Sequence, residues 1–311
     1  VVRFNEKTNP VPAKWSHNDR AEIVLTIIPV IILVAMAWPA TKVLMNMADT
    51  RNSEMTIEIT GYQWKWGYRY VGTDVSFISS LDRLSDDTRQ LGSNMDPAAV
   101  PNYLLNVDRP LVIPADTKVR FVITAADVIH AWWVPALGWK QDAIPGIINE
   151  AWTNIKVPGT FRGQCTELCG KDHGFMPIVV RVVPAEDYSK WVGERKALLA
   201  KAADDDGRDY TLDQLKARGE KVYAANCVAC HQASGKGMPP AFPPLDGSKI
   251  VLGPKAGQID VVMNGRPKTA MQAFKQLNNV ELAAVITFTR NNWGNKTGEA
   301  IQPAEVKALR K

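Results

Sequence analysis

Cysteine and histidine are scarce in this sequence, with four of each among 311 residues. The cysteines form two close pairs, Cys165 with Cys169 and Cys227 with Cys230. Each pair has a histidine within a few residues, so each has a candidate metal or cofactor role. No cysteine then remains for structural disulfides, which argues against a small disulfide-framework protein.

Charge is nearly absent from one long stretch. Between Ile23 and Met47 the only charged residue is Lys42. About twenty-five apolar residues suffice to cross a bilayer, so we expect a transmembrane helix at 23–47. Pro29 and Pro39 are tolerated in membrane helices better than in soluble ones. The alternative is a buried core helix, but few such helices run this long without polar residues.

The start of the chain shows neither an initiator methionine nor a signal-peptide pattern. Four basic residues precede the apolar stretch, and the positive-inside tendency places residues 1–22 on the cytoplasmic side: Arg3, Lys7, Lys14 and Arg20. Everything after Met47 is then expected on the outer face.

Cys227-Val228-Ala229-Cys230-His231 is the attachment pattern of a c-type haem, with two thioether anchors and an imidazole ligand for iron. A chance match is the alternative, but the flanking sequence fits as well. A helical stretch precedes the motif, a Pro-rich loop follows it, and an amphipathic helix is expected at 280–291. Met271 lies in a later loop and can supply the second axial ligand. Met263 and Met238 are its competitors.

This C-terminal region resembles a class I cytochrome c, an all-α domain in which the first and last helices cross beside the haem. By that resemblance the haem is held by Cys227, Cys230, His231 and Met271.

A second group of soft ligands lies upstream. Cys165, Cys169, His173 and Met176 fall within twelve residues, and this nitrogen and sulfur set suits copper better than magnesium or calcium. Structural zinc and a disulfide are the alternatives, although a thioether ligand is unusual for zinc. His130 stands alone among apolar residues, where a histidine is more often a core residue than a ligand.

Together, the segments around His130 and around 165–176 resemble the binuclear copper A domain of cytochrome c oxidase subunit II. The resemblance implies bridging thiolates at Cys165 and Cys169, with terminal imidazoles at His130 and His173. Met176 and the Glu167 carbonyl would be weak axial ligands. The Glu167 carboxylate would reach a magnesium ion shared with subunit I.

Two further positions carry roles implied by the same resemblance. Trp64, the first Trp of Gln63-Trp64-Lys65-Trp66, corresponds to the tryptophan through which electrons enter, although strand aromatics usually serve packing. Glu22, seven residues before Pro29, corresponds to a carboxylate at the mouth of a proton channel in subunit I. Its simpler role is to complement the dipole at a helix start.

Beyond the membrane, alternating apolar and polar residues at 55–60, 118–124 and 178–183 predict strands of a cupredoxin-like Greek-key sandwich. We therefore expect a multidomain protein: a cytoplasmic segment (1–22), a transmembrane helix (23–47), an all-β copper A domain (48–198), a linker (199–210) and an all-α cytochrome c domain (211–311). The polar stretch 79–100 is expected to be a surface loop. The family has two transmembrane helices, and only the second is expected here.

From residue 211 onward the chain has fourteen Lys and Arg against seven Asp and Glu. This excess can steer an acidic electron donor or lie against anionic lipid. No nucleic-acid recognition motif accompanies it.

The resemblance as a whole is to subunit II of a caa3-type haem-copper oxidase. It implies that electrons pass from a donor cytochrome c or an upstream respiratory complex to haem c, then to copper A, then to the haem of subunit I. Oxygen reduction and proton pumping would belong to subunit I, with subunit III as a further partner. The expected location is the bacterial inner membrane, with both redox domains outside.

Three rival classes are disfavoured by the sequence. Quinol oxidase subunits lack the copper ligands present here. Nitrous oxide reductase needs a histidine-rich catalytic domain, and this chain has only four histidines. A copper-delivery protein would need neither Met176 nor a haem site.

Overall fold

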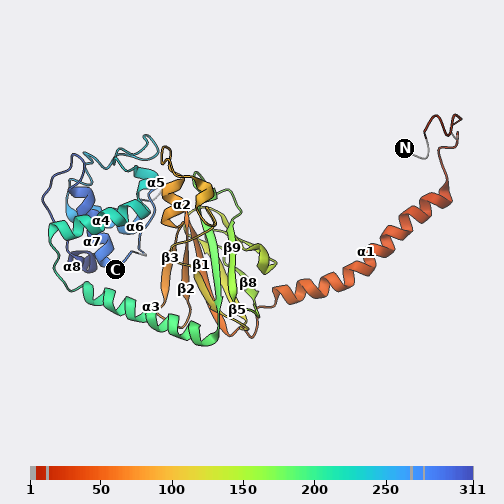
Figure 1. Ribbon diagram of the computed structural model, residues 1–311, viewed down its shortest axis with the longest axis horizontal. Helices are drawn as coiled ribbons and strands as arrows, with labels where there is room; N and C mark the ends of the chain where they lie inside the picture. The colour runs from red at the N-terminus through yellow and green to blue at the C-terminus, as the bar shows by residue number, and fades with distance from the viewer. Residues whose placement is uncertain (1–4, 12–13, 267–268, 276, 311) are drawn as a thin grey trace. The chain divides into compact units, whose positions relative to one another are not determined.

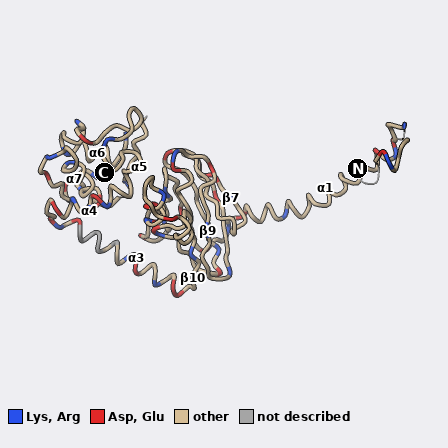
Figure 2. Tube along the Cα trace, turned by 45° about the horizontal axis from the view of Figure 1, so that its top comes forward, with Lys and Arg blue, Asp and Glu red and all other residues tan. Residues whose placement is uncertain are grey.

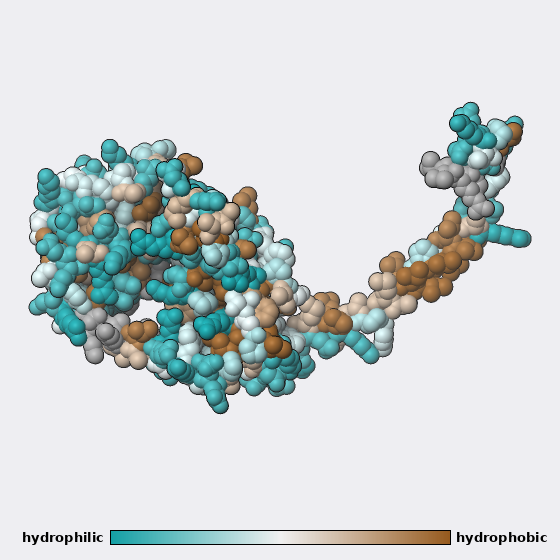
Figure 3. Space-filling model, in the orientation of Figure 1, coloured by the Kyte–Doolittle hydropathy of each residue, from teal (hydrophilic) through white to brown (hydrophobic). Residues whose placement is uncertain are grey.

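The computed structural model describes residues 5–11, 14–266, 269–275 and 277–310. The chain divides into an N-terminal unit, 1–51, and a second unit, 52–311. The first consists mainly of α1 (Asp19–Ala48), 30 residues long and of sufficient length and apolarity to cross a membrane. The helix begins before the expected position because the Asn18 side chain accepts a hydrogen bond from Ala21 N and caps it. Figure 2 shows α1 almost without charge, and Figure 3 shows its apolar surface.

The second unit begins with a sandwich of two five-stranded sheets (Figure 1). One sheet has the order β3-β2-β1-β5-β8: Ser76–Ser79, Lys65–Tyr70, Met55–Tyr62, Val119–Ala125 and Asn149–Thr153. The other has the order β4-β10-β9-β6-β7: Leu111–Pro114, Pro177–Val183, Gly159–Cys165, His130–Trp133 and Lys140–Ala143. The three strands predicted from alternation are confirmed as β1, β5 and β10.

Alternation explains how the sandwich is filled. In β1 and β5 every second side chain is buried, including Ile57, Ile59, Phe121 and Ile123 at 0% exposure. The parallel register of these two strands sets Ile57 opposite Phe121 and Ile59 opposite Ile123, so both strands present one apolar face to the core. The short helices η2 (Pro135–Leu137) and η3 (His173–Phe175) lie in the connections at the ends of strands.

The stretch 79–100 is not a simple surface loop, so that expectation is wrong in part. It contains the helix α2 (Arg83–Thr88) and the short helix η1 (Pro97–Ala99). Asp82 caps α2 through a bond from Ser85 N, and the side chains of Ser85 and Thr88 are buried. Polar side chains anchor this segment, and therefore it has no apolar periodicity to read.

The predicted linker also differs. The helix α3 (Ala185–Asp205) continues through the first half of the expected linker, 199–210. Alanine-rich sequence with acidic residues in the first turn favours a helix as much as a polar hinge. The non-helical connection is therefore short, reaching only to Thr211, which caps the next helix.

The C-terminal domain is helical: α4 (Leu212–Asn226), α5 (Val228–His231), α6 (Lys255–Asn264), α7 (Asn279–Arg290) and α8 (Pro303–Leu309). Helix α4 packs against α7 at Gly219, where an added Cβ would lie 2.1 Å from the Ala284 carbonyl oxygen. A glycine is therefore required for this approach of the two helices. Helix α7 is the most deeply buried helix of the domain and covers the region predicted as 280–291.

Candidate metal and haem sites

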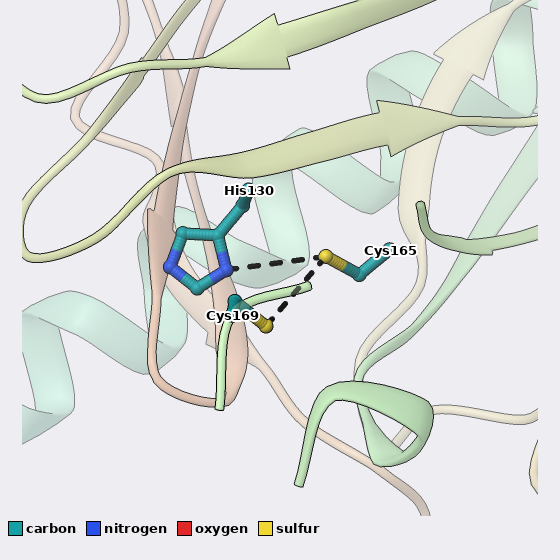
Figure 4. Close-up of side chains that lie close together, drawn as sticks. All are labelled: His130, Cys165 and Cys169. Carbon is teal, nitrogen blue, oxygen red and sulfur yellow. Dashed lines mark hydrogen bonds between the residues drawn. The ribbon is translucent and has the colours of Figure 1, made fainter. Parts of the chain in front are cut away.

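Strand ends bring the predicted copper ligands together. Strands β6 and β9 pair with Trp132 opposite Cys165, so His130 at the start of β6 and Cys165 at the end of β9 share one end of the sandwich. The connection from β9 to β10 passes through Cys169 and His173 before β10 begins at Pro177. Figure 4 shows His130, Cys165 and Cys169 pointing toward one another.

The six candidate donors form a continuous cluster. Cys165 Sγ lies 3.9 Å from His130 Nδ1 and 3.8 Å from Cys169 Sγ. Cys169 Sγ in turn lies 3.5 Å from His173 Nδ1 and 3.6 Å from Met176 Sδ. Cys165 Sγ also lies 3.4 Å from the Glu167 carbonyl oxygen. Each sulfur therefore has one imidazole and one weak donor beside it.

This cluster fits a shared metal centre. Both cysteines are free and buried, and a sulfur separation of 3.8 Å is far too long for the disulfide considered above. Two sulfurs that bind the same first-row metal ion at about 2.3 Å lie at most about 4.6 Å apart. The observed sulfur separation of 3.8 Å is within this limit. A set of two thiols, two imidazoles, a thioether and a carbonyl exceeds the four ligands of structural zinc and suits copper.

The two cysteine sulfurs are within hydrogen-bond distance of each other. Their mutual hydrogen bond lowers the pKa of Cys165 to about 3, and the same bond raises the pKa of Cys169 far above its ordinary value. The lowered pKa of Cys165 favours its thiolate form, which is the form that binds metal.

Asp127 orients the His130 imidazole. Its Oδ1 lies 2.9 Å from His130 Nε2, and a carboxylate only accepts, so Nε2 carries the proton and Nδ1 is left bare toward Cys165. Burial lowers the pKa of His130, but hydrogen bonds to Asp127 and Cys165 outweigh burial, so the pKa is raised overall. Asp127 Oδ2 also accepts from Gln63 N at 2.8 Å.

The aromatic motif contacts the same loop. Trp64 Nε1 donates to the Cys169 carbonyl at 3.2 Å, and Gln63 Nε2 donates to that carbonyl at 2.8 Å. Gly170 has φ +116°, and an added Cβ would lie 3.0 Å from Gln63 Nε2. A glycine therefore lets the loop main chain approach these two side chains.

The haem-attachment residues lie where α4 passes into α5. Burial raises the pKa of Cys227 to about 12 and also raises the pKa of Cys230, so both thiols are protonated at neutral pH. His231 Nδ1 donates to the Pro243 carbonyl at 3.0 Å, which leaves Nε2 as the free nitrogen. Two free thiols with an imidazole fixed in this tautomer fit a covalently attached haem.

The three methionines that compete for the opposite axial position differ in environment. Met263 is 3% exposed and belongs to the helical core, as expected for a packing residue. Met238 pairs through its main chain with Phe242 at 2.7 and 3.0 Å. Met271 is half-buried in a loop against the same core, and its role as an axial ligand stays a prediction.

The sandwich and the helical domain also touch. Lys65 Nζ donates to Asn226 Oδ1 at 3.1 Å, and burial lowers the pKa of Lys65 to about 8. Gln272 Nε2 donates to the Gln63 carbonyl at 3.2 Å. Gln272, the residue after Met271, therefore contacts Gln63, whose side chain donates to the Cys169 carbonyl.

Glu22 serves the start of α1. Its carboxylate accepts from Asn18 N at 3.1 Å and lies 2.9 Å from His17 Nδ1. This is the simpler of the two roles considered for Glu22, and a role at a proton channel stays a prediction. The Glu167 carboxylate as a magnesium ligand also stays a prediction.

Sequence reasoning assigned no role to Asp127, Gln63 or Arg89. Asp127 lies three residues before His130, and this spacing was an available signal because ligating histidines commonly bond a carboxylate. The contacts of Gln63 with Cys169 and of Arg89 with Asp172 join residues that are 106 and 83 positions apart, which no local pattern reveals.

Comparisons with known proteins agree with this organisation. Three family models match: "Cytochrome C oxidase subunit II, transmembrane domain" over 1–43, its "periplasmic domain" over 55–183, and "Cytochrome C oxidase, cbb3-type, subunit III" over 214–288. Probable cytochrome c oxidase subunit 2 of Rickettsia bellii is 45% identical over 64% of this chain and 71% of its own length. The corresponding protein of Rickettsia prowazekii is 47% identical over 61% of this chain, which spans 58% of that relative.

Among solved structures, the periplasmic domain of subunit II of cytochrome oxidase (CoxB) from Bradyrhizobium japonicum is 40% identical. The match covers 48% of this chain and 98% of that domain, with a TM-score of 0.41.

Proposed function

Because the chain belongs to the cytochrome c oxidase subunit II family, we propose that it transfers electrons from a covalently attached haem c to a binuclear copper A centre and on to subunit I. The observation that carries this proposal is the convergence of two free thiols, two imidazoles, a thioether and a carbonyl at one end of the sandwich.

The proposed copper ligands are the six clustered donors: His130, Cys165, the Glu167 carbonyl, Cys169, His173 and Met176. Copper held by these donors would supply one-electron redox chemistry. The chain's own residues hold the donors in place and exclude water. His130 and Cys165 are at most 5% exposed, and Trp132 is fully buried beside them. A site filled by protein donors has no open position for substrate, unlike a catalytic metal site.

The proposed haem ligands are His231 through Nε2 and Met271, with thioether bonds to Cys227 and Cys230. Trp64 is proposed as the residue through which electrons enter the copper loop, supported by its hydrogen bond to the Cys169 carbonyl. The Glu167 carboxylate is proposed to bind magnesium at the boundary with subunit I, and Glu22 to lie near a proton channel of that subunit.

The chain is anchored in the membrane by α1 and has a periplasmic domain. We propose that this membrane is the bacterial inner membrane. The proposed partners of the chain are subunits I and III, surrounding lipid, and a cytochrome c or upstream respiratory complex as electron donor. Oxygen reduction and proton pumping are assigned to subunit I, as in a caa3-type oxidase.

Metal analysis and electron paramagnetic resonance of the purified chain test the proposal. We expect two coppers and one iron per chain, and a seven-line hyperfine pattern from one unpaired electron shared by two coppers. Cys165→Ser should abolish that pattern while leaving the c-type haem absorption unchanged. A four-line signal from a single copper, or zinc alone, would contradict the copper assignment.

A further inference from the structure

One arginine of the 79–100 segment contacts the loop that carries the proposed copper ligands. Arg89 follows α2 directly, and its guanidinium carbon lies 4.2 Å from the centre of the Phe175 ring. Its Nη1 lies 3.5 Å from Asp172 Oδ1. The Arg89 side chain is 20% exposed and that of Asp172 only 7%, so both charges are largely withdrawn from water.

These two contacts lie on either side of a proposed ligand. Asp172 immediately precedes His173, and Phe175 follows it by two residues, all in the turn that forms η3. Phe175 N donates to the Asp172 carbonyl at 2.9 Å, which closes this turn. The Arg89 guanidinium therefore contacts both ends of this turn. The same turn places His173 Nδ1 near Cys169 Sγ.

The arginine is itself held rigidly. Arg89 Nε donates to Asp86 Oδ1 at 2.7 Å, and its main-chain N donates to the Ser85 carbonyl at 3.0 Å. Ser85 is fully buried and accepts through Oγ from Leu104 N at 3.2 Å. The end of α2 is thus tied to the segment that leads into β4, independently of the loop.

We propose that Arg89 is a positioning residue that fixes the His173 turn for metal binding, and that this is a function of the 79–100 segment. A planar guanidinium can pair with a carboxylate and stack on an aromatic ring at once, which a lysine cannot do as well. Without Arg89, the ion pair that remains to the nearly buried Asp172 carboxylate, among the residues that the structure describes, is the one with Lys171 at 3.2 Å. The turn would then open toward water and His173 would lose its fixed direction. The expected effect on copper binding rests on the proposed function, whereas the contacts of Arg89 with Asp172 and Phe175 do not.

The test compares Arg89→Met with Arg83→Met in the full-length chain in detergent. Arg83 lies on the same segment but is 87% exposed and pairs with Asp87 at 3.4 Å, so it is a matched control. The first measurement is amide hydrogen exchange in the copper-free chain. We expect faster exchange in 170–176 for Arg89→Met and unchanged exchange in β1 and β5, whereas Arg83→Met should match the wild type.

The second measurement is copper affinity by competition with a chelator. Loss of a residue that orients a ligand lowers metal affinity about 10- to 100-fold, and we expect this for Arg89→Met with less than about twofold for Arg83→Met. Arg89→Lys should restore only part of the affinity. In a double-mutant cycle, Asp172→Asn should make the effect of Arg89→Met smaller, because the two side chains act together.

The outcomes separate the two proposals. If the wild-type chain bound no copper, the proposed function would fail. The exchange experiment would still test the clamp, which is the pair of contacts that Arg89 makes with Asp172 and Phe175. Equal exchange in 170–176 for the two methionine variants would overturn the clamp even in a chain that binds two coppers. If Arg89→Met failed to fold, the lesser substitution Asp172→Asn should still accelerate exchange in 170–176, and unchanged exchange there would overturn the clamp.

Discussion

Replacing Asp127 with alanine should weaken copper binding without removing any metal ligand. The carboxylate bonds His130 Nε2 at 2.9 Å, Val128 N at 2.7 Å and Gln63 N at 2.8 Å. Without it, the His130 ring loses both the partner that fixes its tautomer and the charge that increases its basicity. Outer partners of this kind contribute about 10- to 100-fold to metal affinity, which corresponds to about 1.4 to 2.7 kcal/mol of binding free energy.

The assay is a copper titration of the full-length chain against a chelator of known affinity, followed by the hyperfine pattern of the loaded protein. Asp116→Ala is the control, because Asp116 is 67% exposed and pairs with Lys156 on the surface. Its copper affinity should equal that of the wild type. If Asp127→Ala also bound copper within about twofold of the wild type, the argument that Asp127 positions His130 would be refuted.

Three further results are expected. Copper affinity should fall as pH falls through the raised pKa of His130, because protons then compete for the imidazole, which must be neutral to bind metal. Equilibrium copper binding between pH 8 and 5 measures this, and an affinity that did not change with pH would contradict it. Gly219→Ala should destabilise the helical domain by about 1 to 3 kcal/mol through overpacking against α7. Gly257→Ala should not destabilise it, because an added Cβ there meets nothing within 4 Å, and thermal unfolding followed at the haem absorption compares the two variants. Met271→Ala should lower the haem reduction potential, because a thioether opposite histidine raises it, and an unchanged potential in a redox titration would exclude Met271 as the ligand.

Part of the proposed metal site could be predicted from sequence, because soft donors at short spacing indicate a metal, while the family resemblance added His130. Cys165, Cys169, His173 and Met176 lie in one short segment, and the strand that begins at His130 pairs with the strand that ends at Cys165. Alternation likewise located the sandwich strands, since one face of each is buried.

The parts that sequence did not predict depend on tertiary contacts or on ambiguous composition. Arg89 reads as one more charged residue in a polar segment until Asp172 and Phe175 are brought beside it by the fold. The anchoring of that segment uses buried polar groups such as Ser85, which carry no periodic signal. Residues 199–205 are rich in alanine and aspartate, and such a sequence is compatible with either a helix or a hinge.

The continuous helix α3 limits how far the helical domain can move from the sandwich that it contacts. A helix of 21 residues spans about 30 Å, and only a few non-helical residues follow it before α4 begins. Such a tether confines the haem-attachment segment to a small volume, so its local concentration near the sandwich is set by the chain itself and can reach the millimolar range. Under the proposed function, the internal reaction should therefore be first order, with a rate that does not change when the protein is diluted.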